Sequence, residues 1–217
     1  MAAVPMKAEY GPTLGQLLAP RWQRASRPAR AAVIAAAIAL LLLAVAAALT
    51  LENAKFHEGG RVPFSFSYRG LSRVPADPGS FVKVQSHSAD GALKYSFSVD
   101  PILLPPYSGS LAAEIPIYAA SYIEHLRRNS QGFVLRGEGK TRVTNTELGY
   151  QILYTSTVDG RRMYGRNVLL LPPHAGAREG VALVMLTATN ASPQVASPME
   201  VASTGVLLRP LKTFSFG

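Results

Sequence analysis

Residues 80–100, "SFVKVQSHSADGALKYSFSVD", contain two alternating runs of apolar and polar residues that are separated by Asp90-Gly91. Alternation with a period of two indicates a half-buried β-strand, and an Asp-Gly pair favours the positive φ angles of a tight hairpin turn. The apolar side chains of the second run share one face of the strand: Leu93, Tyr95, Phe97 and Val99. The stretch therefore predicts an antiparallel hairpin with one face in a core.

Strand patterns continue on both sides of this hairpin. Upstream, "VPFSFSY" at 62–68 alternates aromatic residues with serines, which is typical of a half-buried strand. A second Asp-Gly pair, Asp159-Gly160, predicts another tight hairpin. Downstream runs with strand character occupy residues 132–137, 140–147, 150–158, 161–171 and 181–190.

Two segments have helical patterns. In "SLAAEIPIYAASYIEHLRRN", residues 110–129, apolar side chains recur at spacings of three and four, which predicts an amphipathic helix with Pro116 in its first turn. In "SPMEVASTGVLLRP", residues 197–210, Ser197 and Glu200 have the spacing of a capping box and predict a second helix. One antiparallel sheet covered by two helices predicts an α+β domain over residues 62–217, after a linker at 52–61.

The order of these elements from Pro63 to Phe216 resembles the PsbP-like superfamily. The similar parts are the opening strand "FSFSY" and the helix end "YIEHLRR" followed by "GFVLRGEGKTRVTNTELGYQILYTST". The long hairpin "GRRMYGRNVLLL", the strand "VALVMLTAT" and the terminal segment "VLLRPLKTFSF" complete the resemblance. The resemblance implies an α/β/α sandwich. Members of this superfamily mostly act as binding or assembly modules, so the resemblance implies no catalytic residues for this chain.

An apolar run at 31–51 precedes the domain. Its 21 residues carry no charge, and about 20 residues of helix are enough to cross the hydrocarbon layer of a bilayer. A secretory signal usually has an apolar core of only ~7–15 residues close to the N-terminus, whereas 30 residues precede this run. These features favour a retained transmembrane helix at 31–51 over a signal peptide that is removed.

Arginines before the apolar run predict its orientation. Positive charge stays on the cytoplasmic side of a membrane, so residues 1–30 are expected to be a cytoplasmic basic segment and the domain is expected to be extracytoplasmic. An indole flanked by arginines suits the headgroup region. The residues expected at the membrane interface are Trp22, Arg24, Arg27 and Arg30. The chain is thus predicted to be a single-pass protein of the plasma membrane.

Charge and cysteine content exclude several classes of function. The net charge is +9, of which residues 1–30 carry +4 and the remainder carries +5. Without a cysteine, the chain has no disulfide framework, thiolate metal site or cysteine nucleophile. The abundance of arginine and alanine is typical of a GC-rich bacterial genome. An extracytoplasmic placement disfavours nucleic acid as a partner.

A basic cluster around the second hairpin is the candidate binding site. Basic side chains interleaved with an aromatic ring could bind an envelope protein, an anionic lipid headgroup or an acidic polymer. An alternative interpretation is a solvated hairpin tip. The residues of this cluster are Arg161, Arg162, Tyr164 and Arg166, with Arg136 and Arg142 expected nearby.

No catalytic, cofactor or metal pattern accompanies this cluster. Ser80 and Lys83 match S-x-x-K, but an alternating strand places them on opposite faces and the partner motifs are missing. The four histidines lack metal-ligand spacing, and no phosphate loop occurs. We therefore expect a non-catalytic binding or scaffolding protein of the bacterial cell envelope. Two alternatives stay open: a hydrolase or transferase with a dispersed site, and a sensor or regulatory subunit that signals through the helix.

Overall fold

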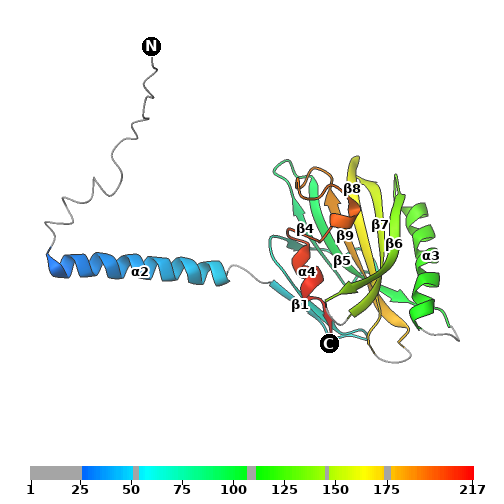
Figure 1. Cartoon of the computed structure of the whole chain (residues 1–217), viewed down its shortest axis with the longest axis horizontal. Coiled ribbons are helices and arrows are strands. Elements are labelled where there is room, and N and C mark those ends of the chain that lie inside the picture. The colour runs from blue at the N-terminus through cyan, green and yellow to red at the C-terminus, as the bar shows by residue number, and fades with distance from the viewer. Residues whose placement is uncertain (1–25, 51–53, 107–110, 145–146, 174–176) are drawn as a thin grey trace, which may run out of the picture. The chain divides into compact units, whose positions relative to one another are not determined.

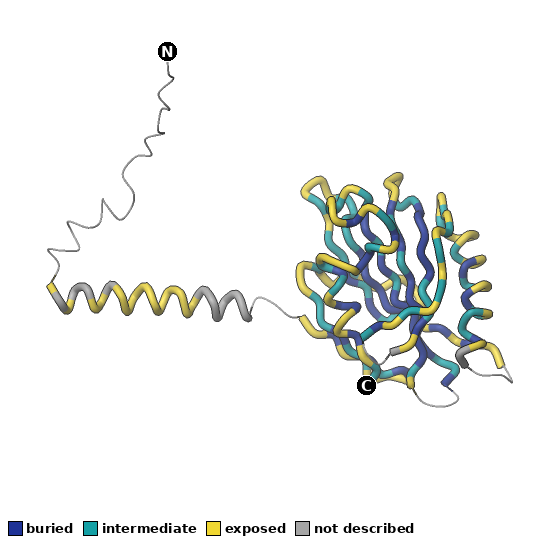
Figure 2. The backbone as a smooth tube through the Cα atoms, viewed as in Figure 1, coloured by how far each residue is buried: buried dark blue, intermediate teal, exposed yellow. Residues whose placement is uncertain are grey.

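The computed structural model describes residues 26–50, 54–106, 111–144, 147–173 and 177–217 (Figure 1). The chain divides into two compact units, residues 1–52 and 53–217. The first unit contains helix α2, Arg27–Thr50, and every side chain of α2 that the structure describes is exposed (Figure 2). No helix in the described ranges combines the length and the apolarity that a membrane span needs. Trp22 and Arg24 lie outside the described residues, and so do the side chains of Arg27 and Arg30.

The second unit contains two antiparallel sheets (Figure 1). The smaller has the order β1-β2-β10, and the larger has the order β3-β4-β5-β9-β8-β7-β6. In the small sheet the strands are β1 (Ala54–Glu58), β2 (Phe64–Tyr68) and β10 (Ser215–Phe216). In the large sheet they are β3 (Ser72–Val74), β4 (Val82–His87), β5 (Leu93–Leu103), β6 (Val134–Val143), β7 (Glu147–Val158), β8 (Arg161–Leu170) and β9 (Glu179–Ala188).

Both predicted hairpins are confirmed. Gly91 joins β4 to β5 with a φ of 80°, and the turn is closed by a hydrogen bond of 2.8 Å from Ser88 N to Ala92 O. Asp159 and Gly160 have φ angles of 49° and 74° and connect the paired ends of β7 and β8. Aspartate and glycine tolerate this left-handed conformation better than most residues, which explains why Asp-Gly pairs mark both turns.

An aromatic core lies on one face of the large sheet. The alternating phenylalanines of β2 point toward that sheet, and the Phe66 ring lies 4.9 Å from the Phe97 ring of β5, measured between centroids. Near the C-terminus, Phe214 contacts Phe64 at 5.6 Å. Phe64, Phe97 and Phe214 are all 0% exposed. The small sheet and the C-terminal segment therefore cover this face together.

Helix α3, Leu111–Asn129, covers part of the opposite face (Figure 1). Its Ala119 and Ile123 are buried in a second core with Ile152 and Leu169 of the large sheet. The chain leaves β5 in the middle of the sheet, forms α3 and enters the edge strand β6, so the helix packs over β6 and β7. The C-terminal part of β5 joins this core through Ile102, and the part around Ser98 and Asp100 is left outside the helix layer.

Several expectations from the sequence differ from this fold. The two strands expected at 132–137 and 140–147 form the single strand β6. The domain is α+β and mostly sheet, but the large sheet is not covered by two helices, because the small sheet covers one face. Residues 54–58 of the expected linker at 52–61 form β1 and pair with β2. Pro116 lies beyond the first turn of α3, at a position where proline removes a helical hydrogen bond.

The predicted C-terminal helix is much shorter than its sequence pattern indicates. Glu200 accepts hydrogen bonds from Ala196 N at 2.6 Å and Ser197 N at 3.0 Å, as the capping-box spacing predicts. Yet the turn that follows is only the 3-10 helix η1, Pro198–Glu200. Positive φ angles at Ala202 and Gly205 interrupt the helix, and a short α4 begins again at Leu208–Thr213.

Truncation of Phe66 tests the aromatic core. Phe66→Ala is expected to lower the free energy of unfolding by about 3–5 kcal/mol, because a large cavity would remain in a closely packed core. Urea unfolding followed by circular dichroism measures this change. The matched control is Leu148→Ala, where the side chain is 65% exposed and the expected change is below about 0.5 kcal/mol. Equal effects of both substitutions would contradict the assigned core.

Candidate functional site

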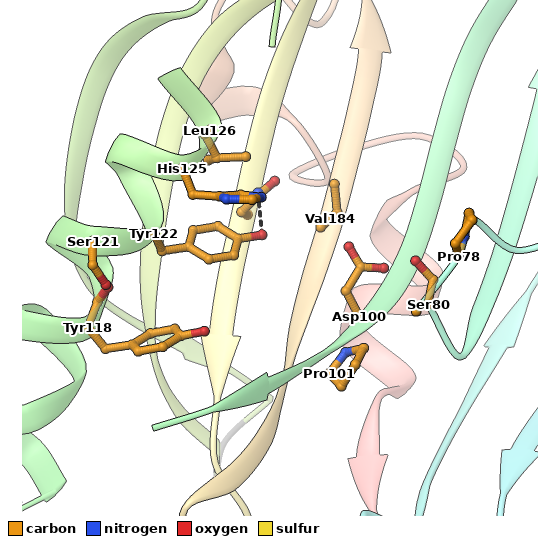
Figure 3. A pocket seen from close by; sticks show the side chains of 12 residues that line it. Pro78, Ser80, Asp100, Pro101, Tyr118, Ser121, Tyr122, His125, Leu126 and Val184 are labelled. Atoms are coloured by element: carbon orange, nitrogen blue, oxygen red, sulfur yellow. Dashed lines mark hydrogen bonds between the residues drawn. The ribbon is translucent and has the colours of Figure 1, made fainter. Parts of the chain in front are cut away.

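A cavity of about 570 Å³ opens between α3 and β5, and we call it the α3 groove (Figure 3). Side chains from α3 form one side, and β5 with the loop before β4 forms the other (Figure 3). The lining residues are Tyr118, Ser121, Tyr122, His125 and Leu126 of α3, Asp100 and Pro101 of β5, Asn167 of β8, Val184 of β9, and Pro78, Gly79 and Ser80 of the loop.

Strand alternation explains why polar side chains form the floor of this groove. Phe97 and Val99 of β5 belong to the aromatic core, so Ser98 and Asp100 must point to the α3 side of the sheet. The register places Ser98 opposite Val184, and Val184 opposite Asn167. Residues opposite each other in neighbouring strands share a face. The sheet thereby brings one polar residue from β5 and one from β8 into the same row.

A chain of hydrogen bonds crosses the buried end of the groove. The Tyr154 hydroxyl donates to Asn167 Oδ1 at 3.1 Å. Asn167 Nδ2 in turn donates to the Tyr122 hydroxyl at 3.1 Å, which is the dashed line in Figure 3. Asn167 is 0% exposed. Since the Tyr122 oxygen acts as an acceptor here, its own hydroxyl hydrogen remains available for another partner.

Burial keeps the hydroxyls of Tyr122 and Tyr154 protonated. It raises the pKa of the Tyr122 hydroxyl strongly, and the negative charges of Tyr154 and Asp100 would act in the same direction. Burial also raises the pKa of Tyr154, against the effect of its hydrogen bond to Asn167. Both hydroxyls are therefore hydrogen-bond donors at physiological pH and are poorly suited to act as bases.

Gly165 makes room for the Tyr154 ring. A Cβ atom at position 165 would lie 2.3 Å from Cζ of Tyr154, which is far inside van der Waals contact. The ring therefore lies directly over the backbone of β8, and its hydroxyl reaches Asn167 two residues further along the strand. The glycine is needed for this close approach and not for an unusual backbone conformation.

Asp100 is the partly buried carboxylate of the groove. Burial raises its pKa above the ordinary value of 3.8, while hydrogen bonds with Ser80 and Ser98 act in the opposite direction. Its Oδ1 atom is buried without a hydrogen-bond partner among the described residues. Lys83, the cation that acts on its pKa, is bound by both carboxylate oxygens of Asp77, at 3.0 and 2.8 Å. Asp100 therefore forms no ion pair with any residue that the structure describes.

The basic cluster predicted from the sequence is divided between separate environments. Arg161 pairs with Asp90 of the other hairpin at 2.8 Å. Hydrogen bonds from Ser88 and Arg161 hold the pKa of the Asp90 carboxyl well below its usual range. The charge of Arg161 is thus largely compensated within the protein, while Arg162 lies exposed beside it at the hairpin tip.

The other members of the cluster lie farther along the sheet. Tyr164 packs against the aromatic core. Arg166 donates to the backbone oxygen of Val201 at 3.1 Å, and burial lowers the pKa of its guanidinium. On the edge strand β6, Arg136 lies at a bulge and Arg142 pairs with Leu148. Arg161 pairs with Val158, which lies on the same strand, β7, as Leu148. The two partners are ten residues apart, so Arg142 and Arg161 are separated by roughly 33 Å along the strand direction. The fold does not bring these residues together as one site.

Three local sequence patterns indicate the residues of the α3 groove, although each also has an ordinary structural explanation. Serines and an aspartate on one face of β5 indicate either a solvated face or a polar site, and only the position of α3 distinguishes these. Tyr118 and Tyr122 have the spacing of neighbours on one helix face. Asn167 interrupts an otherwise apolar half-strand, "NVLLL".

The described residues contain no group of three histidine or acidic side chains that could hold a metal ion. His125 lies at the rim of the groove, where its ring contacts the Asn129 amide at 3.1 Å. Ser80 of the S-x-x-K pattern also lines the groove, beside Asp100. The lining thus offers hydroxyls, one imidazole, one amide and one carboxylate.

Comparison with known proteins shows the fold. No protein-family model matches this chain, and no curated protein matches it significantly in sequence. The crystal structure of LpqN, which is involved in cell envelope biogenesis of Mycobacterium tuberculosis, is similar with a TM-score of 0.50 and 8% identity. That match covers 76% of this chain and 91% of LpqN. At this identity the similarity shows a shared fold alone.

Two further structures are similar at lower scores. A protein from Bacteroides thetaiotaomicron has a TM-score of 0.45 and 11% identity, over 76% of this chain and 49% of its own. The Ran-binding protein Mog1p from Saccharomyces cerevisiae has a TM-score of 0.45 and 13% identity, over 76% of this chain and 95% of its own.

Replacement of the buried carboxylate gives a pH-dependent prediction. Because the pKa of Asp100 is raised in the folded state, its ionisation costs stability as the pH rises through the folded-state pKa. Asp100→Asn should therefore increase the free energy of unfolding at pH 7, and the gain should shrink as the pH falls toward 3. Urea unfolding at several pH values measures this difference.

Asp159→Asn is the matched control, since the same change is made at an exposed turn position that also suits asparagine. Asp159→Asn should not raise the free energy of unfolding at pH 7 by a similar amount. An Asp100→Asn variant that is less stable than the parent protein at pH 7 would contradict the assigned effect of burial.

Proposed function

We propose that this protein is a membrane-anchored, non-catalytic binding module of the bacterial cell envelope and that its ligand occupies the α3 groove. The observation that carries the proposal is the convergence of Asp100, Tyr122 and Asn167, which come from three different elements, on one open cavity. A concave site with a few converging polar groups is the usual form of a ligand pocket.

The state of the polar groups supports binding rather than catalysis. Tyr122 retains its proton, and its hydroxyl is fixed in place by Asn167. Asp100 is kept partly buried at a cost in stability, although asparagine could fill the same space. Such costs are commonly retained where a residue has a functional role. The groove is therefore a fixed set of hydrogen-bonding groups that a ligand could complement.

The envelope location is supported by the sequence and by the shared fold. The 21-residue apolar run and the arginines before it are typical of a single-pass helix with the N-terminus inside. LpqN, which has the same fold, is involved in cell envelope biogenesis. We propose the plasma membrane as location, with residues 53–217 outside the cytoplasm.

Membrane fractionation tests the anchor. The full-length protein should stay in the membrane fraction after an alkaline carbonate wash, and mass spectrometry should find residues 27–51 retained in the mature chain. A variant that lacks residues 31–51 should be recovered in the soluble fraction. A mature chain that begins near Ala48 or Lys55 would show that the apolar run is a cleaved signal.

Site-specific photo-crosslinking tests the groove. A benzoylphenylalanine at position 121, an exposed position at the groove rim, should give an adduct with an envelope component in living cells. The control places the same group at position 199, where Met199 is 56% exposed on η1. We expect an adduct from position 121 only. Equal yields from both positions, or no adduct from position 121, would count against a ligand in the groove.

A further inference from the structure

The chemistry of the α3 groove indicates which kind of ligand it would accept. Asp100 is the one acidic or basic side chain, histidine aside, that lines the groove, and it forms no ion pair with a described residue. Lys83 and Asp77, which also influence this carboxylate, neutralise each other through two short contacts. His125 lies on α3 across from Asp100 (Figure 3). The groove therefore has a local negative charge in a domain whose overall charge is positive.

Two tyrosines stand opposite this carboxylate. Tyr118 and Tyr122 project from successive turns of α3 into the space that Asp100 faces from β5 (Figure 3). Aromatic ring faces attract cations, most strongly where water is excluded. The Asn167 amide fixes the Tyr122 ring by its hydrogen bond. A carboxylate and two aromatic rings thus surround one cavity.

We propose that the α3 groove binds an organic cation, an alkylammonium or guanidinium group, which pairs with Asp100 and packs against Tyr118 and Tyr122. The inference rests on the proposed function, since it names the class of ligand for the same groove. A bound cation would supply the opposite charge that Asp100 lacks and would favour its ionised form. It would thereby recover the stability that burial of the carboxylate costs.

Other ligand classes fit the groove less well. An anion would be placed beside Asp100 without an uncompensated cation to offset the repulsion. A metal ion usually needs several oxygen or nitrogen ligands, and the described residues supply no group of three acidic or histidine side chains. A neutral ligand would leave the carboxylate without a counter-charge.

Calorimetric titration of the full-length protein in detergent micelles tests the inference. The probes are arginine amide, lysine amide and the neutral isostere citrulline amide, each acetylated on its α-amino group so that only the side chain differs in charge. Acetyl-glycyl-arginyl-glycine amide compares a free cation with one carried by a peptide. Arginine amide or lysine amide should bind with about 10- to 100-fold higher affinity than citrulline amide, because a hydrogen bond to a charged group contributes more than one between neutral groups. The relative affinity of the tripeptide identifies the source of the cation.

Asp100→Asn should abolish this preference for a cation, and Asp159→Asn should leave it unchanged. Circular dichroism checks that both variants are folded. Equal binding of arginine amide and citrulline amide, a preference that survives Asp100→Asn, or no binding of any probe would each overturn the inference. Crosslinking at position 121 tests the proposed function separately. An adduct at position 121 together with equal binding of charged and neutral probes would refute the cationic ligand class and support the proposed binding function.

Discussion

The pairing of β9 with β5 is the contact on which the rest of the domain depends. The chain leaves β5 in the middle of the large sheet, and the meander β6-β7-β8-β9 returns to it from the far edge. Helix α3 must therefore run over the strands that the meander inserts, and it packs on β6 and β7. A single helix of this length does not cover the whole face. The uncovered part over β5 becomes the α3 groove, so the position of the candidate site is a consequence of strand order.

Two faces of the same sheet have different chemistry because strand alternation separates them. One face joins Phe97 and Val99 to the phenylalanines of the small sheet and forms a dry aromatic core. The other carries Ser98, Asp100 and Asn167. The Asn167 amide is hydrogen-bonded to Tyr122 and Tyr154, and Asp100 has hydrogen bonds with Ser80 and Ser98. Buried polar groups cost stability unless they are hydrogen-bonded. The aromatic core therefore supplies the stability that allows the α3 side to retain an unpaired carboxylate.

The charges of this protein act locally and not as one field. Arg161 is compensated by Asp90, Lys83 by Asp77, and Arg166 is directed at the backbone of Val201. The positive total of the domain therefore does not identify a partner, whereas the one carboxylate of the groove does suggest a class of ligand. Compensation of this kind explains why a cluster of arginines in the sequence is a weak indication of a binding surface.

The sequence by itself determined β2, β4, β5 and the strands β7 to β9, both Asp-Gly hairpins, the amphipathic helix α3 and the apolar run before the domain, because each follows from local periodicity or turn chemistry. It also indicated an α+β domain dominated by antiparallel strands. Only the tertiary structure decided that β1 belongs to the domain, that a small sheet and not a second helix covers the aromatic face, and that the predicted arginines lie apart. It also decided that Asp100, Tyr122 and Asn167 meet. These features depend on strand order and register, which bring together residues far apart in the chain, and local patterns carry no information about such distant contacts.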